Sequence, residues 1–328
     1  MLKTLKRLIP WLICAIIFYY LFKQIPPKEM LVALQLVNLP KFIFYSLLYF
    51  ILILVLDCFT ITYFISRFST KITFKESLLV RGVSYLIMIL NYHAAQGAFA
   101  VYFKKTHKAS IAKTLGTLGF ISIADLILVF TSGLVALSFT EVTYKGFDLQ
   151  DYSLKIAPFL YIGYALWVLF WKNIDNPIFD PIKKYKIINW LLGHNIFLIF
   201  REAGLKDYFI LFLSRLPMIA VIIGAYNWAL ISYDSLINWV DIYLYNPIVM
   251  LVTTLPITPS GLGTGQWLTI EFFKDKTTSP LVDQGLLTTE NLLLTSNILW
   301  YIANQILKAA FGLFCISKTS RDLFKEET

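Results

Sequence analysis

The stretch FIFYSLLYFILILVLDCFTITYFI, residues 42–65, decides the class of fold. Asp57 is its only charged residue, and the rest is almost entirely apolar. About 20 consecutive apolar residues are enough to cross a bilayer as a helix. The stretch is therefore predicted to be a transmembrane helix.

The chain contains seven further apolar segments, which are separated by short polar loops. The chain is 58% hydrophobic and 15% charged, with a mean hydropathy of +0.67, whereas soluble domains carry about 25% charged residues. We expect an all-α polytopic membrane protein, with a single integral membrane domain over 1–328 and an amphipathic interfacial helix over 187–205. The apolar segments are 8–22, 78–103, 114–140, 153–171, 207–231, 243–273 and 286–316.

The net charge of +9 comes from basic residues in separate loops. This pattern favours membrane orientation and contact with anionic lipid over nucleic-acid binding. Cys14, Cys58 and Cys315 all lie in apolar segments, without metal-ligand or disulfide spacing. The sequence also lacks recognisable nucleotide-binding, metalloprotease and hydrolase motifs. We therefore expect no metal, no cofactor and no enzymatic activity.

Two apolar segments, 78–103 and 243–273, contain residues that interrupt a membrane helix. Proline removes a backbone donor and glycine loosens the backbone, while unpaired backbone groups in hydrocarbon cost several kcal/mol. Both segments are therefore predicted to be re-entrant hairpins of broken helices. The interrupting and polar residues are Arg81, Asn91, His93, Gln96 and Gly97 in the first, and Pro247, Pro256, Pro259, Gly261, Gly263 and Gly265 in the second.

The loop charges favour this topology. With two re-entrant hairpins and about six crossings, most of the 29 Lys and Arg residues lie on the cytoplasmic side, together with both termini. With eight full crossings, slightly more of them lie outside, against the positive-inside rule. Each hairpin then stands between two crossing helices, in opposite orientations in the two halves. This arrangement suggests an inverted repeat of the kind found in transporters.

The strongest local signal is LPITPSGLGTGQ, residues 255–266. One interpretation is a loop between two helices at the membrane surface. The other is a broken helix whose free N–H groups and positive end, near Gln266, cradle an anion such as phosphate. No lysine and serine or threonine follow the glycines, which excludes a nucleotide-binding P-loop.

Charged residues within the apolar segments form a second group of candidates. Each costs about 2.5–3.5 kcal/mol at a helix centre, so it should face protein or water. One interpretation is that the side chains of Arg81 and Arg215 snorkel to the membrane interface. The other is that they pair with Asp57 or Asp125, or with a lipid phosphate. Lys308 is close enough to its helix end to reach the interface as well.

At these two hairpins the chain resembles the flippase-like transmembrane domain of bacterial lysylphosphatidylglycerol synthases, which also occurs as stand-alone membrane proteins. The Leu-Pro-x-x-Pro-x-Gly-Leu-Gly run at 255–263 is the most specific mark. Arg81-Gly82, Asn91, Gly97 and Asp125 are weaker marks. The resemblance extends from helix 42–65 to helix 286–316.

The chain departs from the family pattern at three places. Ala94 and Ala95 stand where the family usually has a proline, and Ile121 and Ser122 where it often has Glu-Arg. Gln266 replaces a common glutamate at the end of the second motif. These departures indicate a diverged member, with a different lipid as substrate. Since the chain ends at Thr328, just after the last helix, we expect no lysyl transfer.

The resemblance implies a lipid flippase in the cytoplasmic membrane that moves a polar or anionic headgroup between leaflets. The substrate would be a phospholipid or a polyprenyl-phosphate-linked lipid. Two alternatives stay open: a non-catalytic partner of a lipid or cell-envelope synthase, and an intramembrane lipid-modifying enzyme. The candidate substrate-binding residues are Arg81, Asn91, Gln96, Gly97, Asp125, Arg215, Pro256, Pro259, Gly261, Gly263 and Gln266.

Overall fold

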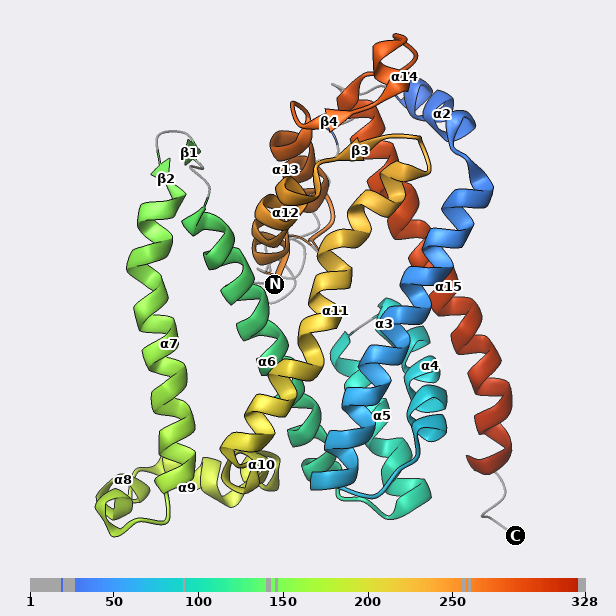
Figure 1. The fold of residues 1–328 in the computed structure, drawn as a ribbon. Helices are drawn as coiled ribbons and strands as arrows, with labels where there is room; N and C mark the ends of the chain where they lie inside the picture. The colour runs from blue at the N-terminus through green and yellow to red at the C-terminus, as the bar shows by residue number, and fades with distance from the viewer. Residues whose placement is uncertain are drawn as a thin grey trace, which may run out of the picture. The chain divides into compact units, whose positions relative to one another are not determined.

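Helices make up most of the computed structural model, which describes residue 19 and residues 27–90, 92–139, 143–144, 147–254, 258 and 261–323. Figure 1 shows the elements in chain order. They are α2 (Pro27–Leu36), α3 (Leu39–Phe68), α4 (Phe74–Leu90), α5 (Tyr92–His107), α6 (Ile111–Ser138), β1 (Thr143–Tyr144), β2 (Phe147–Asp148), α7 (Leu149–Asn173), α8 (Asp180–Lys183), α9 (Lys186–Gly193), α10 (Leu198–Glu202), α11 (Leu205–Ile231), β3 (Leu236–Ile237), α12 (Trp239–Thr254), α13 (Thr264–Phe273), β4 (Thr277–Thr278), α14 (Pro280–Asp283) and α15 (Thr289–Leu323). The strands form two antiparallel two-residue pairs, β1 with β2 and β3 with β4.

Within these ranges, five helices are long and apolar enough to cross a membrane. They match the expected crossings at 42–65, 114–140, 153–171, 207–231 and 286–316, and they confirm an all-α polytopic membrane protein. The expected helix over 8–22 lies outside the described residues except for Tyr19, so the total of six crossings stays a prediction. The candidate spans are Leu39–Phe68, Ile111–Ser138, Ser153–Asn173, Leu205–Ile231 and Thr289–Ile316.

Helices α4 and α5 form the first hairpin, within the expected segment and its flanks. They pack side by side (Figure 1). With 17 and 16 residues, each is about 25 Å long, shorter than the hydrocarbon core of about 30 Å. A capping box begins α4: the Thr73 backbone N–H donates to the Glu76 carboxylate at 2.7 Å, and the Glu76 N–H donates to the Thr73 hydroxyl at 3.3 Å. Whether this hairpin is re-entrant stays a prediction.

Helices α12 and α13 form the second hairpin, and glycine shapes the turn between them. Gly261 and Gly263 have φ angles of +72° and +83°, which residues with a side chain rarely adopt. A Cβ atom at Gly261 would lie 2.7 Å from the Cβ atom of Thr253, near the end of α12. The glycines thus let the chain turn against α12 and start α13 at Thr264. Pro256 and Pro259 lie outside the described residues.

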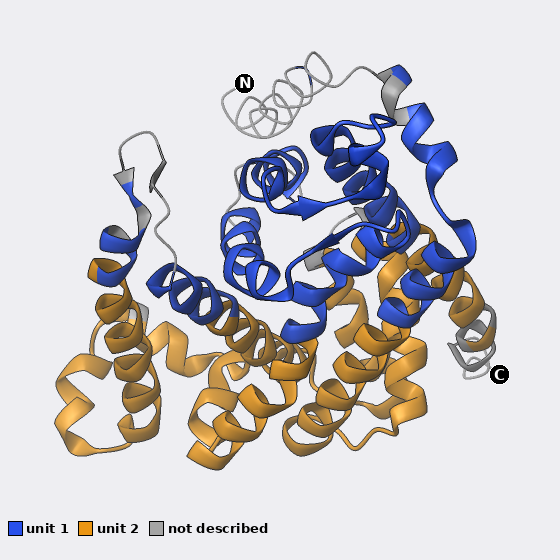
Figure 2. Cartoon of the chain, turned by 45° about the horizontal axis from the view of Figure 1, so that its top comes forward, with its two compact units in different colours: residues 1–50, 129–154, 219–304 blue, residues 51–128, 155–218, 305–328 orange. Residues whose placement is uncertain are grey.

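The chain divides into two compact units (Figure 2). Unit 1 comprises residues 1–50, 129–154 and 219–304, and unit 2 comprises residues 51–128, 155–218 and 305–328. Unit 2 contains the first hairpin and unit 1 contains the second. The long helices α3, α6, α7, α11 and α15 contribute residues to both units, so neither unit is a continuous segment. The expectation of one domain over 1–328 stays a prediction.

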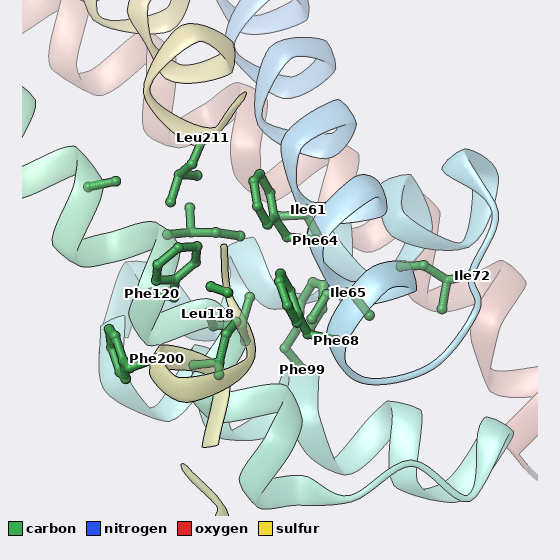
Figure 3. Close-up of a cluster of buried hydrophobic side chains, with 14 of the residues drawn as sticks. Ile61, Phe64, Ile65, Phe68, Ile72, Phe99, Leu118, Phe120, Phe200 and Leu211 are labelled. Atoms are coloured by element: carbon green, nitrogen blue, oxygen red, sulfur yellow. The ribbon is translucent and has the colours of Figure 1, made fainter. Parts of the chain in front are cut away.

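Unit 2 is organised around an apolar core to which α3, α6, α10 and α11 contribute (Figure 3). Phe120 belongs to this core, with its ring 4.9 Å from that of Tyr208 and 5.7 Å from that of Phe200. Ile61, Ile121 and Leu211 are buried in the same core. On their helices they lie four residues from Asp57, Asp125 and Arg215, respectively. Because residues four apart share one face of a helix, the core also brings the faces with these charged residues together.

A smaller core in unit 1 joins α6 to the second hairpin. Ala136 and Leu137 of α6 pack with Ile248 of α12, and Tyr245 and Phe272 cover them. This contact supports the hairpin from one side.

The interfacial helix expected over 187–205 is not continuous. It consists of α9, a 3₁₀ turn over Asn195–Phe197, and α10. His194 has extended backbone angles, φ −101° and ψ 119°, and its ring nitrogen Nδ1 lies 2.6 Å from the carbonyl oxygen of Trp190. The break follows Gly193, a residue that ends helices readily. Trp190 is exposed, while Phe200 is buried in the core of unit 2.

Candidate functional site

Arg215 of α11 lies at the centre of a buried charge cluster in unit 2. Its Nε and Nη2 atoms donate to the two carboxylate oxygens of Asp125 on α6, at 2.5 and 2.6 Å. Its Nη1 atom donates to Oδ1 of Asp57 on α3, at 2.7 Å. The side chains of Arg215 and Asp57 are each only 4% exposed. One guanidinium therefore ties three membrane helices together through charge-assisted bonds.

A second arginine completes the coordination of Asp57. The Nε atom of Arg81 on α4 lies 2.6 Å from Oδ2 of Asp57, and the Arg81 side chain is 12% exposed. Asp57 is thus held between two guanidinium groups. For Arg81 and Arg215, the structure shows pairing with aspartates rather than extension of the side chain to the membrane interface.

A third cation, Lys308 of α15, joins the cluster beside Tyr85. The Nζ atom of Lys308 lies 5.8 Å from the centre of the Tyr85 ring, and Cζ of Arg81 lies 5.5 Å from it. Lys308 is half-buried and lies within electrostatic range of Arg81 and Asp57. Both cations therefore lie beside the Tyr85 ring, whose face stabilises their charges.

Glycines bring α15 close enough to α4 for this contact. A Cβ atom at Gly82 would lie 2.3 Å from Sγ of Cys315, and one at Gly312 would lie 2.8 Å from the carbonyl oxygen of Gly82. Small residues that let two helix backbones approach are typical of membrane helix packing. Gly312 is one turn after Lys308 and Gly82 follows Arg81, so the crossing places the two cations together.

The cluster carries one more positive than negative charge. Arg81, Arg215 and Lys308 face Asp57 and Asp125 among the described residues. Asp125 lies near the midpoint of α6, about 20 Å from either end at about 1.5 Å per residue. An uncompensated charge at such a depth is costly unless a counter-ion or water meets it. The Asp125 side chain, at 28% exposed, is more accessible than those of Asp57, Arg81 and Arg215.

Unit 1 contains a separate polar pocket beside the second hairpin, with a volume of about 310 Å³. Gln266 organises its wall. The Oε1 atom of Gln266 accepts a hydrogen bond from the Gly263 backbone N–H at 2.6 Å, and its Nε2 atom donates to Asn297 of α15 at 3.0 Å. The lining residues described are Tyr49, Ile222, Tyr226, Asn246, Val249, Met250, Thr253, Gly261, Leu262, Gly265, Gln266, Thr269, Asn297, Trp300 and Tyr301.

The structure distributes the predicted site residues over both units. Arg81, Asp125 and Arg215 meet in the charge cluster, and Gly261 and Gln266 line the pocket in unit 1, with Gly263 next to them. On α5, the buried Oε1 atom of Gln96 has no hydrogen-bond partner within the described ranges. A Cβ atom at Gly97 would meet nothing within 4 Å. Asn91, Pro256 and Pro259 lie outside the described residues.

Sequence reasoning missed the amide and aromatic residues of the pocket, Asn246, Asn297 and Trp300. Each lies within a largely apolar segment, where an amide or indole carries little signal. The role of Lys308 was also missed, because its distance to the helix end allowed it to reach the interface as well. In the part of the chain that the structure describes, no group of three or more His, Cys, Asp or Glu is arranged to hold a metal ion.

Comparison with protein-family models, with curated proteins and with solved structures found no match to this chain. The resemblance to the flippase-like domain therefore rests on the motif residues quoted above and stays a prediction.

Proposed function

We propose that this protein is a lipid flippase-like transporter that moves an anionic headgroup between the leaflets of the cytoplasmic membrane. The observation that carries the proposal is the buried cluster with its one excess positive charge. A lipid phosphate is an anion that reaches this depth when a headgroup crosses the bilayer, while its acyl chains stay in hydrocarbon. A cationic cluster deep among membrane helices provides the counter-charge that such a headgroup needs.

Within the cluster we assign different roles to the three cations. Arg215 donates from all three of its nitrogens to Asp57 and Asp125, so it positions the cluster. Lys308 and Arg81 flank Tyr85 and are the groups that meet the phosphate. Asp125, being partly exposed, limits how tightly the anion is held, which a transporter needs in order to release it.

The hairpins also support transport. Each compact unit contains one pair of short helices, α4 with α5 and α12 with α13. Short helices in opposite halves of the chain are a feature of transporters with inverted repeats. Cytoplasmic termini and re-entrant hairpins belong to this proposal, as the loop charges favour both. With no nucleotide motif in the sequence, the lipid gradient or the membrane potential would drive transport.

The test is headgroup exchange in phosphatidylcholine proteoliposomes. We expect the protein to flip acyl-labelled phosphatidylglycerol, which is anionic, at least tenfold faster than labelled phosphatidylcholine, which has no net charge. Lys308→Gln should remove at least nine-tenths of this activity, and Lys308→Arg should retain most of it. Lys28→Gln removes one exposed positive charge elsewhere and should have no effect.

Folded protein that flips neither lipid would overturn the proposal and favour a non-catalytic partner of a lipid or envelope synthase. Equal flipping of both lipids, unchanged by Lys308→Gln, would separate transport from the cluster and would also overturn the assigned roles.

A further inference from the structure

The pocket in unit 1 differs chemically from the charge cluster in unit 2. None of its described lining residues is charged. Instead it offers three side-chain amides, from Asn246, Gln266 and Asn297, together with tyrosine and threonine hydroxyls. Uncharged polar groups gathered beside a membrane hairpin suit a ligand that needs many hydrogen bonds and no counter-ion.

The amides are oriented by bonds to the protein and keep capacity for a ligand. Asn297 accepts from Gln266 at 3.0 Å, which leaves its Nδ2 group to donate. Asn246 donates from Nδ2 to the carbonyl oxygen of Ile223 at 2.8 Å, which leaves its Oδ1 atom to accept. The pocket thus presents donors as well as acceptors. A hydroxyl group, which is both, matches this pattern better than a phosphate or an ammonium group does.

An aromatic wall stands beside these amides. The ring of Trp300 lies 5.4 Å from that of Tyr49 and 6.0 Å from that of Phe42, in an edge-on arrangement with the latter. These contacts fix a half-buried indole at the pocket. A sugar ring has an apolar face of C–H groups and hydroxyl groups at its edge. The fixed aromatic ring can pack against the C–H face while the amides bond the hydroxyl groups.

The size of the pocket agrees with a single ring. Its 310 Å³ lies at the lower end of the range of about 300–1,000 Å³ for small-molecule sites. A ligand with a free ammonium group, such as an aminoacylated headgroup, would find no carboxylate among the described lining residues.

We infer that the pocket binds the sugar ring of a glycolipid headgroup through Asn246, Asn297 and Trp300. The inference rests on the proposed function, since it names the headgroup that the transporter takes. It assigns recognition of hydroxyl groups to unit 1 and recognition of negative charge to unit 2.

Binding of uncharged lipids tests the pocket without the charge cluster. The probes are radiolabelled monoglucosyl-diacylglycerol and diacylglycerol with the same acyl chains, bound to the purified protein in detergent. We expect the glucosyl lipid to bind at least tenfold more tightly. Trp300→Leu and Asn297→Leu should each reduce its affinity to that of diacylglycerol, and Trp300→Phe should keep part of the difference. Trp239→Leu, which alters an exposed indole outside the pocket, is the matched control and should change nothing.

Equal affinity for the two lipids would overturn the inference. An equal loss of affinity for both lipids in folded Trp300→Leu and Asn297→Leu would overturn it as well. Flipping in proteoliposomes is measured separately. Glucosyl-lipid binding without flipping of any lipid would overturn transport and leave the pocket assignment standing. If the protein flips phosphatidylglycerol but binds both uncharged lipids equally, transport stands and the pocket assignment is overturned.

Discussion

Arg215 holds both carboxylate oxygens of Asp125 through two parallel hydrogen bonds, at 2.5 and 2.6 Å. Its third nitrogen bonds Asp57, so one side chain joins two aspartates from two other helices. Taking one partner out of a buried ion pair leaves a charge without a counter-ion and costs about 3–5 kcal/mol. The cluster is therefore a structural element as well as a candidate binding site.

From this geometry we predict that Arg215→Met destabilises the protein by about 3–5 kcal/mol, because it removes the ion-pair partner of Asp125 and one of the two partners of Asp57. Thermal unfolding of the purified protein in detergent measures the loss. The double variant Arg215→Met, Asp125→Asn should recover much of the stability, because the unpaired carboxylate is gone and Asp57 keeps its ion pair with Arg81. If the double variant were no more stable than Arg215→Met, the charge account would be wrong.

The fold class followed from the sequence because hydropathy reports burial in lipid directly. The interfacial helix was predicted less well. The apolar pattern of 187–205 continues past Gly193, but His194 adopts an extended backbone and ends α9. Local backbone conformation at one residue decided this break, and hydropathy does not report it.

For the candidate site, the sequence identified Arg81, Asp125 and Arg215 as costly within the membrane and offered pairing as one outcome. It did not reveal which carboxylate pairs with which cation, because Asp57, Asp125 and Arg215 are far apart in the chain and are aligned by the core around Phe120. The contact of Lys308 with Tyr85 depends on the Gly82–Gly312 crossing, which is a property of packing between helices.

Two helical glycines in unit 2 should respond differently to substitution by alanine. At Gly312, a Cβ atom would lie 2.6 Å from Cγ of Leu86 and 2.8 Å from the Gly82 carbonyl oxygen. We expect Gly312→Ala to destabilise the protein by about 1–3 kcal/mol, as overpacking does. At Gly97 nothing lies within 4 Å, so Gly97→Ala should be neutral or should stabilise by up to about 1 kcal/mol. Unfolding temperatures of the two variants check both signs, and equal effects would contradict the close crossing of α4 and α15.

The turn of the second hairpin allows a similar comparison in unit 1. Gly261 and Gly285 have nearly equal φ angles, +72° and +71°. A Cβ atom at Gly261 meets Thr253, whereas at Gly285 it meets nothing within 4 Å. Gly285→Ala should therefore cost only the backbone strain of about 1–2 kcal/mol, and Gly261→Ala should cost more.

The extra cost at Gly261 should fall when Thr253 is also changed to alanine, which removes the Cγ2 atom at 2.9 Å. Unfolding of the two single variants and of the double variant measures the coupling. Additive effects would mean that the Thr253 Cγ2 atom does not restrict residue 261.

The start of α4 should give the protein a measurable acid sensitivity. Burial raises the pKa of Glu76, but hydrogen bonds from the backbone and hydroxyl of Thr73 and the charge of His107 outweigh it, so the pKa lies below its usual value of 4.5. His107 Nε2 lies 3.1 Å from the carboxylate. A carboxyl group with a lowered folded-state pKa stabilises the fold above its unfolded pKa, and that stability is lost as the pH falls through the folded value.

Since glutamine at this position keeps the capping box, Glu76→Gln removes the charge alone. We expect the variant to be less stable than the parent at pH 6 and to lose less stability between pH 6 and pH 3.5. The exposed Glu202→Gln is the matched control. Parallel stability profiles for the parent and Glu76→Gln would show that the Glu76 carboxylate makes no net contribution to this helix start.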